Sequence, residues 1–481
     1  MGTTIFERHR PPASVVRHSL DETRRSVFWL DDLPAQQERP PLSGEQRADL
    51  VGVGGGYTGL WTALPARRRQ PDARIVLLEA NTIGWAASGR NGGFVESSLT
   101  HGRDNGLSRW PDEIDELDRL GMQNLDAIQA DLAEWGVDAD YERVGSMGVA
   151  TEEHQLEWLD EWAADAAARG EGDEVIRLDG AQTRASVDSP TYLGGVWEKH
   201  STALVHPGKL AAGLARVAEE QGIVIFEHSL VKSLDSDGTA GPVRVVTAGG
   251  AVTAAKVVLA TNVFPSLLKR NKLMTVPVYD YALMTEPLEA HQLAAIGWND
   301  RQGLSDLANQ FHYYRLSADN RILFGGYDAL YHYGRKVRPA YENRPATFER
   351  LASHFFTTFP QLEGVQFTHK WAGAIDTSTQ FCAFYGTARD NRIAYAAGFT
   401  GLGVAATRFA GEVMLDLLDG VSTERTTLEM VRKRPLPFPP EPAAAIGINA
   451  TRWSLDRADH NRGRRNILLR TLDALGLGFD S

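Results

Sequence analysis

Apolar runs separated by polar and glycine-rich stretches predict a strand–turn–helix–strand unit near the N-terminus. Residues 50–53 and 74–79 have the apolar character of buried strands, and residues 60–69 predict the helix between them. Pro65 lies inside this helix, so we expect a kink or an early end there. The glycine-rich residues 54–59 join the first strand to the helix, which makes this a βαβ unit.

Periodicity in the rest of the chain predicts a helical insertion, the return of the first sheet and a second sheet. Residues 317–320 have good hairpin chemistry between two strands rich in aromatic residues, so we expect the second sheet to be antiparallel. The predicted helices are residues 113–135, 152–169, 209–221 and 405–418, and the predicted strands are residues 223–226, 243–246, 256–260, 279–285, 311–316, 322–327 and 392–397.

Both ends of the chain lie outside this pattern. Residues 1–46 are polar and interrupted by prolines, which predicts an arm in which only residues 27–30 dock on the protein. Residues 435–442 predict a proline-rich strap. Residues 453–472 combine arginines with apolar residues, which predicts either a helix packed on this chain or on a neighbour, or a segment that lies on an anionic membrane.

Composition excludes several functional classes. The chain is 43% hydrophobic and 23% charged, as expected of a folded globular protein. Its formal net charge of −12 argues against binding to nucleic acid. The single cysteine, Cys382, excludes an intrachain disulfide and a cysteine-cluster metal site, and we expect no metal and a cytoplasmic location. No apolar run predicts a secretory signal or an integral membrane segment, and the oligomeric state stays open.

The turn at residues 54–59 has the spacing of a pyrophosphate-binding turn. Gly54 permits the tight turn, Gly56 lets backbone amides approach a phosphate, and Gly59 allows the helix to pack closely on the strand. Glu79 ends the second strand twenty positions after Gly59, where a carboxylate can accept hydrogen bonds from a ribose. The combination predicts a bound dinucleotide, either NAD or FAD.

Small residues occupy much of positions 84–93, just beyond Glu79. Their backbone amides and the side chains of Ser88, Arg90 and Asn91 are suited to lie against a flat polar ring. An alternative is a flexible surface loop.

Five ordered segments resemble a known family: GGGYTGLWTA, VLLEA, GWAASGRNGG, VVLATN and AAGFTGLGV. Over about residues 48–418 the chain resembles the D-amino-acid oxidase superfamily, in the branch of the glycine, sarcosine and γ-glutamylputrescine oxidases. The resemblance implies an α/β (α+β two-domain) fold, with a Rossmann-like FAD-binding domain and an inserted antiparallel-sheet substrate domain. We expect the arm at 1–46, the FAD-binding domain at 47–110, 201–268 and 371–420, a helical and substrate-domain insertion at 111–200, the substrate domain at 269–370, and the strap and basic helix at 421–481.

The resemblance also implies which residues contact FAD. Glu79 would hold the adenosine ribose, and residues 401–403 would present backbone amides to the pyrimidine end of the flavin, where a helix N-terminus stabilises negative charge. The expected contacts are Gly54, Gly56, Tyr57, Thr58, Gly59, Glu79, Ala80, Ala87, Ser88, Arg90, Asn91, Gly92, Gly93, Val231, Ala260, Thr261, Gly373, Gly398, Thr400, Gly401, Leu402 and Gly403.

Substrate residues are expected on the strands of the second domain. Strand alternation places Tyr313 and Arg315 on one face, and Tyr281 lies on a second aromatic strand. We expect Tyr281, His312, Tyr313 and Arg315 in the catalytic site, with Arg315 anchoring an acidic or amide end of the substrate. An alternative is that the tyrosines belong to the sheet core and Arg315 is a paired structural cation.

Departures from sarcosine oxidase narrow the expected chemistry. The resemblance would place a substrate-binding lysine at Val404 or Ala405, and a flavin-attaching cysteine near Asp376. We therefore expect non-covalent FAD and a small-molecule amine rather than a small α-amino acid.

The expected function is that of an FAD-dependent amine or amino-acid oxidase. It would remove hydride from a carbon that bears an amine, form an imine and pass the electrons to oxygen, with release of hydrogen peroxide. One alternative is a dehydrogenase of the same fold that passes electrons to a quinone or a carrier protein. Another is a non-catalytic, flavin-stabilised binding protein.

Overall fold

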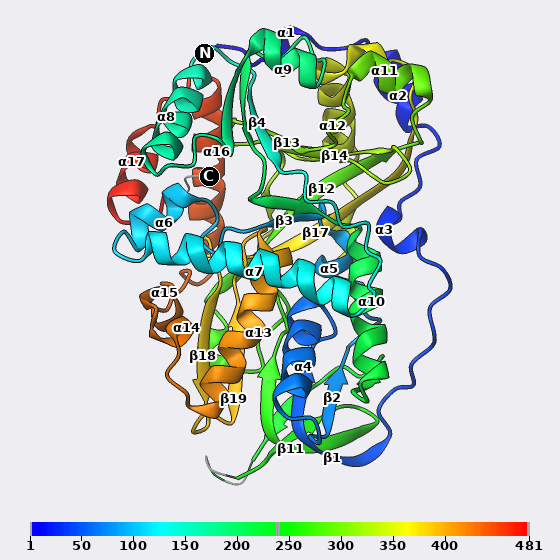
Figure 1. Ribbon diagram of the computed structural model, residues 1–481, viewed down its shortest axis with the longest axis vertical. Helices are drawn as coiled ribbons and strands as arrows, with labels where there is room; N and C mark the ends of the chain where they lie inside the picture. The colour runs from blue at the N-terminus through cyan, green and yellow to red at the C-terminus, as the bar shows by residue number, and fades with distance from the viewer. Residues whose placement is uncertain (1, 237, 239–240, 479–481) are drawn as a thin grey trace.

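Two β-sheets form the framework, one above the other along the long axis of the molecule (Figure 1). The computed structural model describes residues 2–478 except 237 and 239–240. Residues 479–481 of the predicted C-terminal segment therefore lie outside the described residues. The domain boundaries expected from the sequence stay a prediction.

The lower sheet is mostly parallel and is made of apolar strands. β1 (Gly44–Val53) lies between β2 (Ile75–Leu78) and β11 (Gly250–Leu259), and pairs with both in parallel. Strands buried on both faces carry near-continuous apolar runs, which is why the sequence pattern predicted them. The other strands are β8 (Val224–Phe226), β9 (Ser233–Asp235), β10 (Val243–Val246), β18 (Phe384–Ala388) and β19 (Ile393–Ala397).

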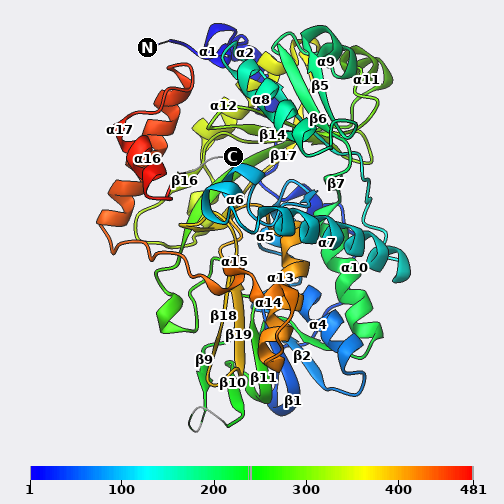
Figure 2. The same ribbon diagram turned by 60° about the vertical axis from the view of Figure 1, so that its left-hand side comes forward.

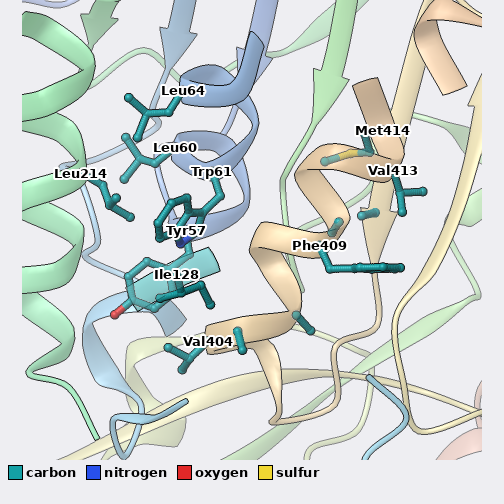
Figure 3. Packing of buried hydrophobic residues seen from close by; sticks show 14 of the residues in the cluster. Tyr57, Leu60, Trp61, Leu64, Ile128, Leu214, Val404, Phe409, Val413 and Met414 are labelled. Carbon is teal, nitrogen blue, oxygen red and sulfur yellow. The ribbon is translucent and has the colours of Figure 1, made fainter. Parts of the chain in front are cut away.

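Helices α4 (Tyr57–Arg69), α10 (Pro207–Glu220) and α13 (Gly403–Asp419) pack together beside this sheet. Figure 3 shows Leu60 and Trp61 of α4 between Leu214 of α10 and the α13 side chains Phe409 and Met414. Of the two outcomes expected at Pro65, the early end is wrong, because α4 continues through Pro65 to Arg69. Tertiary packing on both sides of α4 outweighs the backbone hydrogen bond that the proline removes.

The upper sheet is mixed. β14 (His312–Leu316) and β15 (Ile322–Gly326) form the predicted hairpin, while β13 (Gly303–Asp306) pairs in parallel with β4 (Ser146–Ala150). The sheet is therefore not purely antiparallel, because strands of the helical insertion extend it. Its other strands are β5 (Val175–Asp179), β6 (Gly194–Glu198), β12 (Thr275–Thr285), β16 (Leu330–Tyr331) and β17 (Phe367–Ser378). Its helices are α8 (Gln155–Ala168), α9 (Gly180–Ser186), α11 (Ala290–Ile296) and α12 (Pro345–Thr358).

The N-terminal arm runs from the upper sheet down one side of the molecule to β1 (Figure 1, blue). It carries α1 (Ile5–Arg8), α2 (Ala13–Leu20) and α3 (Phe28–Asp31). Phe28 and Trp29 are buried as predicted, but Phe6 and Val16 are buried as well. The expectation that only residues 27–30 dock is wrong, because α1 and α2 pack on α12.

The remaining elements include the C-terminal helices and several short segments. The basic segment predicted at residues 453–472 falls on two helices, α16 (Ala443–Asp459) and α17 (Ile467–Ala474), and Figure 2 shows α16 beside β16. Among the described residues, no helix combines the length and apolar character needed to cross a membrane. The other elements are β3 (Phe94–Glu96), β7 (Thr202–Leu204), α5 (Ala87–Arg90), α6 (Arg103–Arg109), α7 (Ile114–Glu134), α14 (Glu424–Thr427), α15 (Glu429–Arg432) and 3₁₀ turns at Lys269–Asn271, Pro339–Glu342 and Pro360–Leu362.

Candidate active site

The glycine-rich turn between β1 and α4 forms a cradle at the N-terminus of α4. Gly54 has a positive φ of 116°, and a Cβ atom on Gly59 would lie 2.0 Å from the Gly54 carbonyl oxygen. Side chains at these two positions would break the turn. Gly54, Gly56, Tyr57 and Thr58 line a cavity, so the positive end of the helix dipole faces into it. This arrangement suits a pyrophosphate.

Glu79 is fixed at the end of β2, beside the turn. Its carboxylate accepts hydrogen bonds from the Gly55 N–H at 2.6 Å and from the Asn81 N–H and the Trp85 indole N–H, each at 2.8 Å. An ionised carboxylate has about four acceptor positions, which leaves one for a ribose hydroxyl. The same part of the cavity is lined by Glu79, Ala80, Val231, Ala260 and Thr261.

Helix α5 and the residues after it form the next part of the lining. The Tyr57 N–H donates to Ser88 Oγ at 2.9 Å, and Asn91 Nδ2 donates to the Ala87 and Ser88 carbonyls at 3.0 Å. These bonds hold the loop backbone against the phosphate cradle. The lining residues here are Ala87, Ser88, Arg90, Asn91 and Gly92.

The Arg90 guanidinium joins this loop to the upper sheet. Its Nη1 donates to Glu342 Oε2 at 2.8 Å and to the Ala372 carbonyl at 3.1 Å. The Trp371 indole N–H donates back to the Arg90 carbonyl at 2.9 Å. Arg90 therefore reaches the cavity with its charge already paired.

The wall opposite the loop carries a carboxylate and a phenol. The Tyr313 hydroxyl donates to Asp280 Oδ2 at 2.5 Å, and both residues line the cavity. Burial raises the pKa of Asp280 to about 6, although the hydrogen bond from Tyr313 opposes this shift. A Cβ atom on Gly92 would lie 2.7 Å from the Tyr313 ring, so the loop and this wall are in close contact. The Phe94 ring meets Tyr313 edge-on, with centroids 6.0 Å apart.

Tyr281 lies next to Asp280 on β12 and belongs to the cavity lining, but its side chain has no exposed surface, so its expected place in the catalytic site stays a prediction. Its hydroxyl donates to the Tyr341 carbonyl at 2.7 Å, and its ring packs edge-on against Phe348. The Tyr281 ring therefore packs in the core behind the cavity wall, and its hydroxyl is held by the backbone.

Arg315 does not reach the cavity. Its side chain is only 1% exposed, and Nη1 donates to the Val205 carbonyl at 2.6 Å and to the Gly93 carbonyl at 3.3 Å. The guanidinium also lies over the Trp29 ring, 5.6 Å from its centroid. Arg315 shares a strand face with Tyr313, but residues 93 and 205 cover that face at Arg315. The structure therefore contradicts the expectation that Arg315 lines the substrate cavity and favours the alternative of a structural cation.

His312 lies on the opposite face of β14 and is also absent from the cavity lining. Its Nδ1 lies 2.6 Å from Asp306 Oδ2, and its Nε2 lies 2.9 Å from His354 Nδ1. Alternation along the strand turns His312 away from Tyr313 and into the packed interior. The expectation of a catalytic role for His312 is wrong for the same geometric reason.

The turn before α13 closes the other end of the lining. Gly401 has a positive φ of 97°, and α13 begins at Gly403, so a second helix N-terminus faces the cavity. The Gly398 N–H donates to Asp376 Oδ2 at 2.6 Å, and burial raises the pKa of Asp376 to about 7. Gly373, Thr400, Gly401, Leu402 and Gly403 line the cavity, whereas Gly59, Gly93 and Gly398 pack behind it.

Cys382 lies away from the cavity. It is buried among the apolar side chains beside α13, and burial raises the pKa of its thiol to about 12. A thiol with such a pKa is almost entirely protonated near neutral pH and is a poor nucleophile.

All these parts line one continuous cavity of about 2640 Å³. Pockets for a single small ligand usually measure roughly 300–1,000 Å³, so a dinucleotide and a second molecule fit together. The lining extends from the α4 turn to β12, β14 and the C-terminal residues 436–477. The residues present therefore fit FAD: two helix N-termini, glycine turns that admit no side chain, and a fixed carboxylate at the ribose position.

Sequence reasoning did not select Asp280 and Asp376 as functional groups. Each is the one carboxylate in its strand; the other residues of β12 are apolar, aromatic or hydroxylated, and β17 also carries His369 and Lys370. A carboxylate in such a strand could have indicated a functional residue, because burial of a carboxylate without a function is costly.

A family model described as DAO, FAD dependent oxidoreductase, matches residues 49–417. The γ-glutamylputrescine oxidoreductase of Escherichia coli K12 is 33% identical over 382 residues, which cover 77% of this chain and 84% of that protein. The probable oxidoreductase OrdL of Haemophilus influenzae is 27% identical over 82% of this chain and 88% of that protein. The glycine oxidase structure from Geobacillus kaustophilus superposes with a TM-score of 0.67 at 20% identity, over 81% of this chain and 99% of that one.

Proposed function

The chain belongs to the DAO family of FAD-dependent oxidoreductases that act on amines and amino acids, and we propose that it oxidises a carbon–nitrogen bond of an amine with oxygen as the electron acceptor. FAD, when bound, supplies the hydride acceptor, and water would hydrolyse the resulting imine to a carbonyl compound and an amine. The observation that carries this proposal is the Asp280–Tyr313 pair, which faces the same cavity as the phosphate cradle.

Asp280 supports an amine substrate because its ionised carboxylate attracts a cationic nitrogen and would accept a proton from it, so that the neutral amine loses hydride from its carbon. Tyr313 holds that carboxylate in place by its hydrogen bond. Phe94 and Tyr327 add aromatic surface to the same lining, which favours a cation and its apolar chain. The aromatic and carboxylate groups together would orient the amine carbon towards the cofactor.

We propose that FAD is held without a covalent bond. The one thiol of the chain is buried outside the cavity and is protonated near neutral pH. Asp376 occupies the position near which the resemblance to sarcosine oxidase would place the attaching cysteine, and its carboxylate accepts a backbone hydrogen bond.

A second candidate is a dehydrogenase that passes electrons to a quinone or a carrier protein. The observation in its favour is on α17, where Ile467 is 83% exposed and Leu475 is 65% exposed, next to the exposed Arg470. An exposed apolar and basic helix suits an anionic membrane surface. A flavin-stabilised protein without turnover is the remaining alternative.

The acceptor is tested by steady-state assays of the purified, FAD-loaded protein. Oxygen uptake and peroxide release are measured with polyamines, acylated polyamines, N-alkyl glycines and D-amino acids, and then compared with reduction of an artificial quinone. Peroxide release in proportion to oxygen uptake is the expected result. Turnover with the quinone alone would instead establish the dehydrogenase.

A further inference from the structure

Helix α16 lies beyond residues 49–417, which the family model matches, and yet it lines the cavity. Its cavity-facing residues recur at the three- and four-residue spacing of one helix face. They are Ala443, Ala444, Gly447, Ile448, Thr451, Arg452 and Leu455. Because most of them are small or apolar, Arg452 is the charged group that this face presents to the interior.

Hydrogen bonds fix α16 next to the wall that holds Tyr313. Asp459 accepts from the backbone and side chain of Asn309, and Asp456 Oδ1 accepts from Gln310 Nε2 at 3.3 Å. Residues 309 and 310 lead directly into β14, so Arg452, one helical turn before Asp456, lies on the side of α16 that faces this wall. Glu441 holds the other end by accepting from the Gly334 and Ala445 N–H groups.

Arg452 has no partner among the residues that the structure describes. Its Nε is buried without a hydrogen bond. Four other arginines of the cavity lining pair with carboxylates, and Arg389 donates to the Leu234 carbonyl: the pairs are Arg90 with Glu342, Arg103 with Asp115 and Asp118, Arg169 with Asp165 and Glu171, and Arg465 with Asp473. The Arg452 side chain as a whole is half-buried, but a charged group with a buried donor atom and no acceptor is satisfied by a ligand that supplies one.

We propose that Arg452 binds a carboxylate at the far end of the substrate while the amine end lies at Asp280 and Tyr313. This inference rests on the proposed function and names the substrate class: an amine whose chain ends in an anionic group. The guanidinium binds a carboxylate through two parallel hydrogen bonds, which a neutral amide cannot reproduce. From the sequence we expected Arg315 to bind the acidic or amide end of the substrate. The proposal gives this role to Arg452, on a helix outside the residues that the family model matches.

Two substrates that differ only at the far end test this proposal. N-(4-aminobutyl)succinamic acid ends in a carboxylate, and N-(4-aminobutyl)succinamide ends in a neutral amide. The FAD-loaded enzyme should prefer the acid by tenfold or more in kcat/KM, mainly through KM. Arg452→Gln should abolish that preference and leave kcat/KM for the amide within about twofold. Arg452→Lys should restore part of the preference.

Arg457→Gln is the matched control, because Arg457 lies on the same helix, stacks on Trp453 and is absent from the cavity lining. It should keep the preference of the parent enzyme. Equal preference for the acid in the parent and in Arg452→Gln would overturn the proposal, as would a parent enzyme that oxidises both substrates equally well.

A binding measurement separates this inference from the proposed function. N-(4-hydroxybutyl)succinamic acid keeps the carboxylate but has no oxidisable amine. Calorimetric titration of the FAD-loaded protein should show binding that weakens at least tenfold in Arg452→Gln and not in Arg457→Gln. If no amine is oxidised but this pattern appears, the proposed function fails and the anion site stands. Binding that is absent from the parent, or equal in parent and variant, overturns the site.

Discussion

Charged side chains of the upper sheet differ in their surroundings. Asp280 on β12 points to the cavity, where its hydrogen-bond partner is a phenol. Arg315 on β14 points to two backbone carbonyls and an indole ring. Arg315 is almost fully buried and Asp280 is half-buried, and the degree of burial does not by itself identify the functional one. The position of each group relative to the cavity does.

Arg315→Met should destabilise the protein rather than remove a substrate contact. The change leaves the Val205 carbonyl without its donor at 2.6 Å, and loss of a buried, charge-assisted bond of this kind costs about 3 kcal/mol. Chemical denaturation should show this loss, while the FAD-loaded fraction keeps kcat within a few-fold of the parent. Unchanged stability together with a hundredfold loss of kcat/KM would contradict the structural role.

Asp280→Asn should remove a pH dependence. The pKa of Asp280 is raised to about 6 by burial, so the carboxylate ionises as the pH increases through 6 and only then attracts a cationic amine. For the parent enzyme we expect kcat/KM to rise across this range. In Asp280→Asn this rise should be absent and kcat/KM should be ten- to a hundredfold lower at neutral pH. A parental pH profile in this variant would exclude Asp280 from substrate binding.

Tyr313→Phe tests the direction in which the Tyr313 hydrogen bond shifts the pKa of Asp280. The Tyr313 hydroxyl stabilises the ionised form of Asp280 and so lowers its pKa, against the larger effect of burial. Its removal should move the rise in kcat/KM to higher pH. A shift to lower pH would be inconsistent with the hydrogen bond in the structure.

Positions set by backbone conformation could be predicted from the sequence, whereas side-chain surroundings could not. Gly54 and Gly59 were expected at a tight turn, and the structure has no space for a side chain at either residue. Alternation also placed Tyr313 and Arg315 on one face of a strand. Residues 93 and 205 cover that face at Arg315. They are too distant from it in sequence for any local pattern to reveal the contact.

Among the elements, long periodic segments were predicted closely and short ones were missed. The structure places α7 at Ile114–Glu134, where periodicity predicted residues 113–135, and the β14–β15 hairpin has the expected turn. Helices α1 and α3 have four residues each and lack a periodic pattern. Such short helices depend on tertiary contacts, here of Phe6 and Trp29.

Trp29→Ala tests whether α3 supports the cavity from outside. The Trp29 indole donates to the Asn91 carbonyl at 2.9 Å, and its ring supports Arg315, so the residue holds the loop after α5 in place. The free energy of unfolding should fall by about 3–5 kcal/mol, as for other buried tryptophans, and FAD should dissociate more readily during dialysis. Trp453→Ala is the control, because Trp453 is 53% exposed. Equal effects of the two changes would contradict this role of the arm.

At the scale of the whole molecule, the cavity is shared by the two sheets and the C-terminal helices. A cofactor held there contacts parts of the chain that are far apart in sequence, so its binding should stabilise the entire fold. Ligand at a hundredfold excess over its dissociation constant contributes about 2.7 kcal/mol. Tm should therefore rise with added FAD after the cofactor is removed.

Acid precipitation tests the non-covalent attachment. The flavin should appear in the supernatant, because the thiol of Cys382 is buried and protonated and lies outside the cavity. Colour that remains with the precipitate would contradict this account and would require a covalent attachment site.

The central claim is that an amine bound at the Asp280–Tyr313 wall delivers hydride to the cofactor in the same cavity. The most direct measurement is anaerobic addition of amines to the purified, FAD-loaded protein while the visible absorbance of the flavin is recorded. At least one amine should bleach the flavin, with one equivalent of aldehyde or keto acid formed, and Asp280→Asn should slow the bleaching at least tenfold. If dithionite bleaches the flavin and none of the polyamines, acylated polyamines, N-alkyl glycines or D-amino acids does, the claim is contradicted.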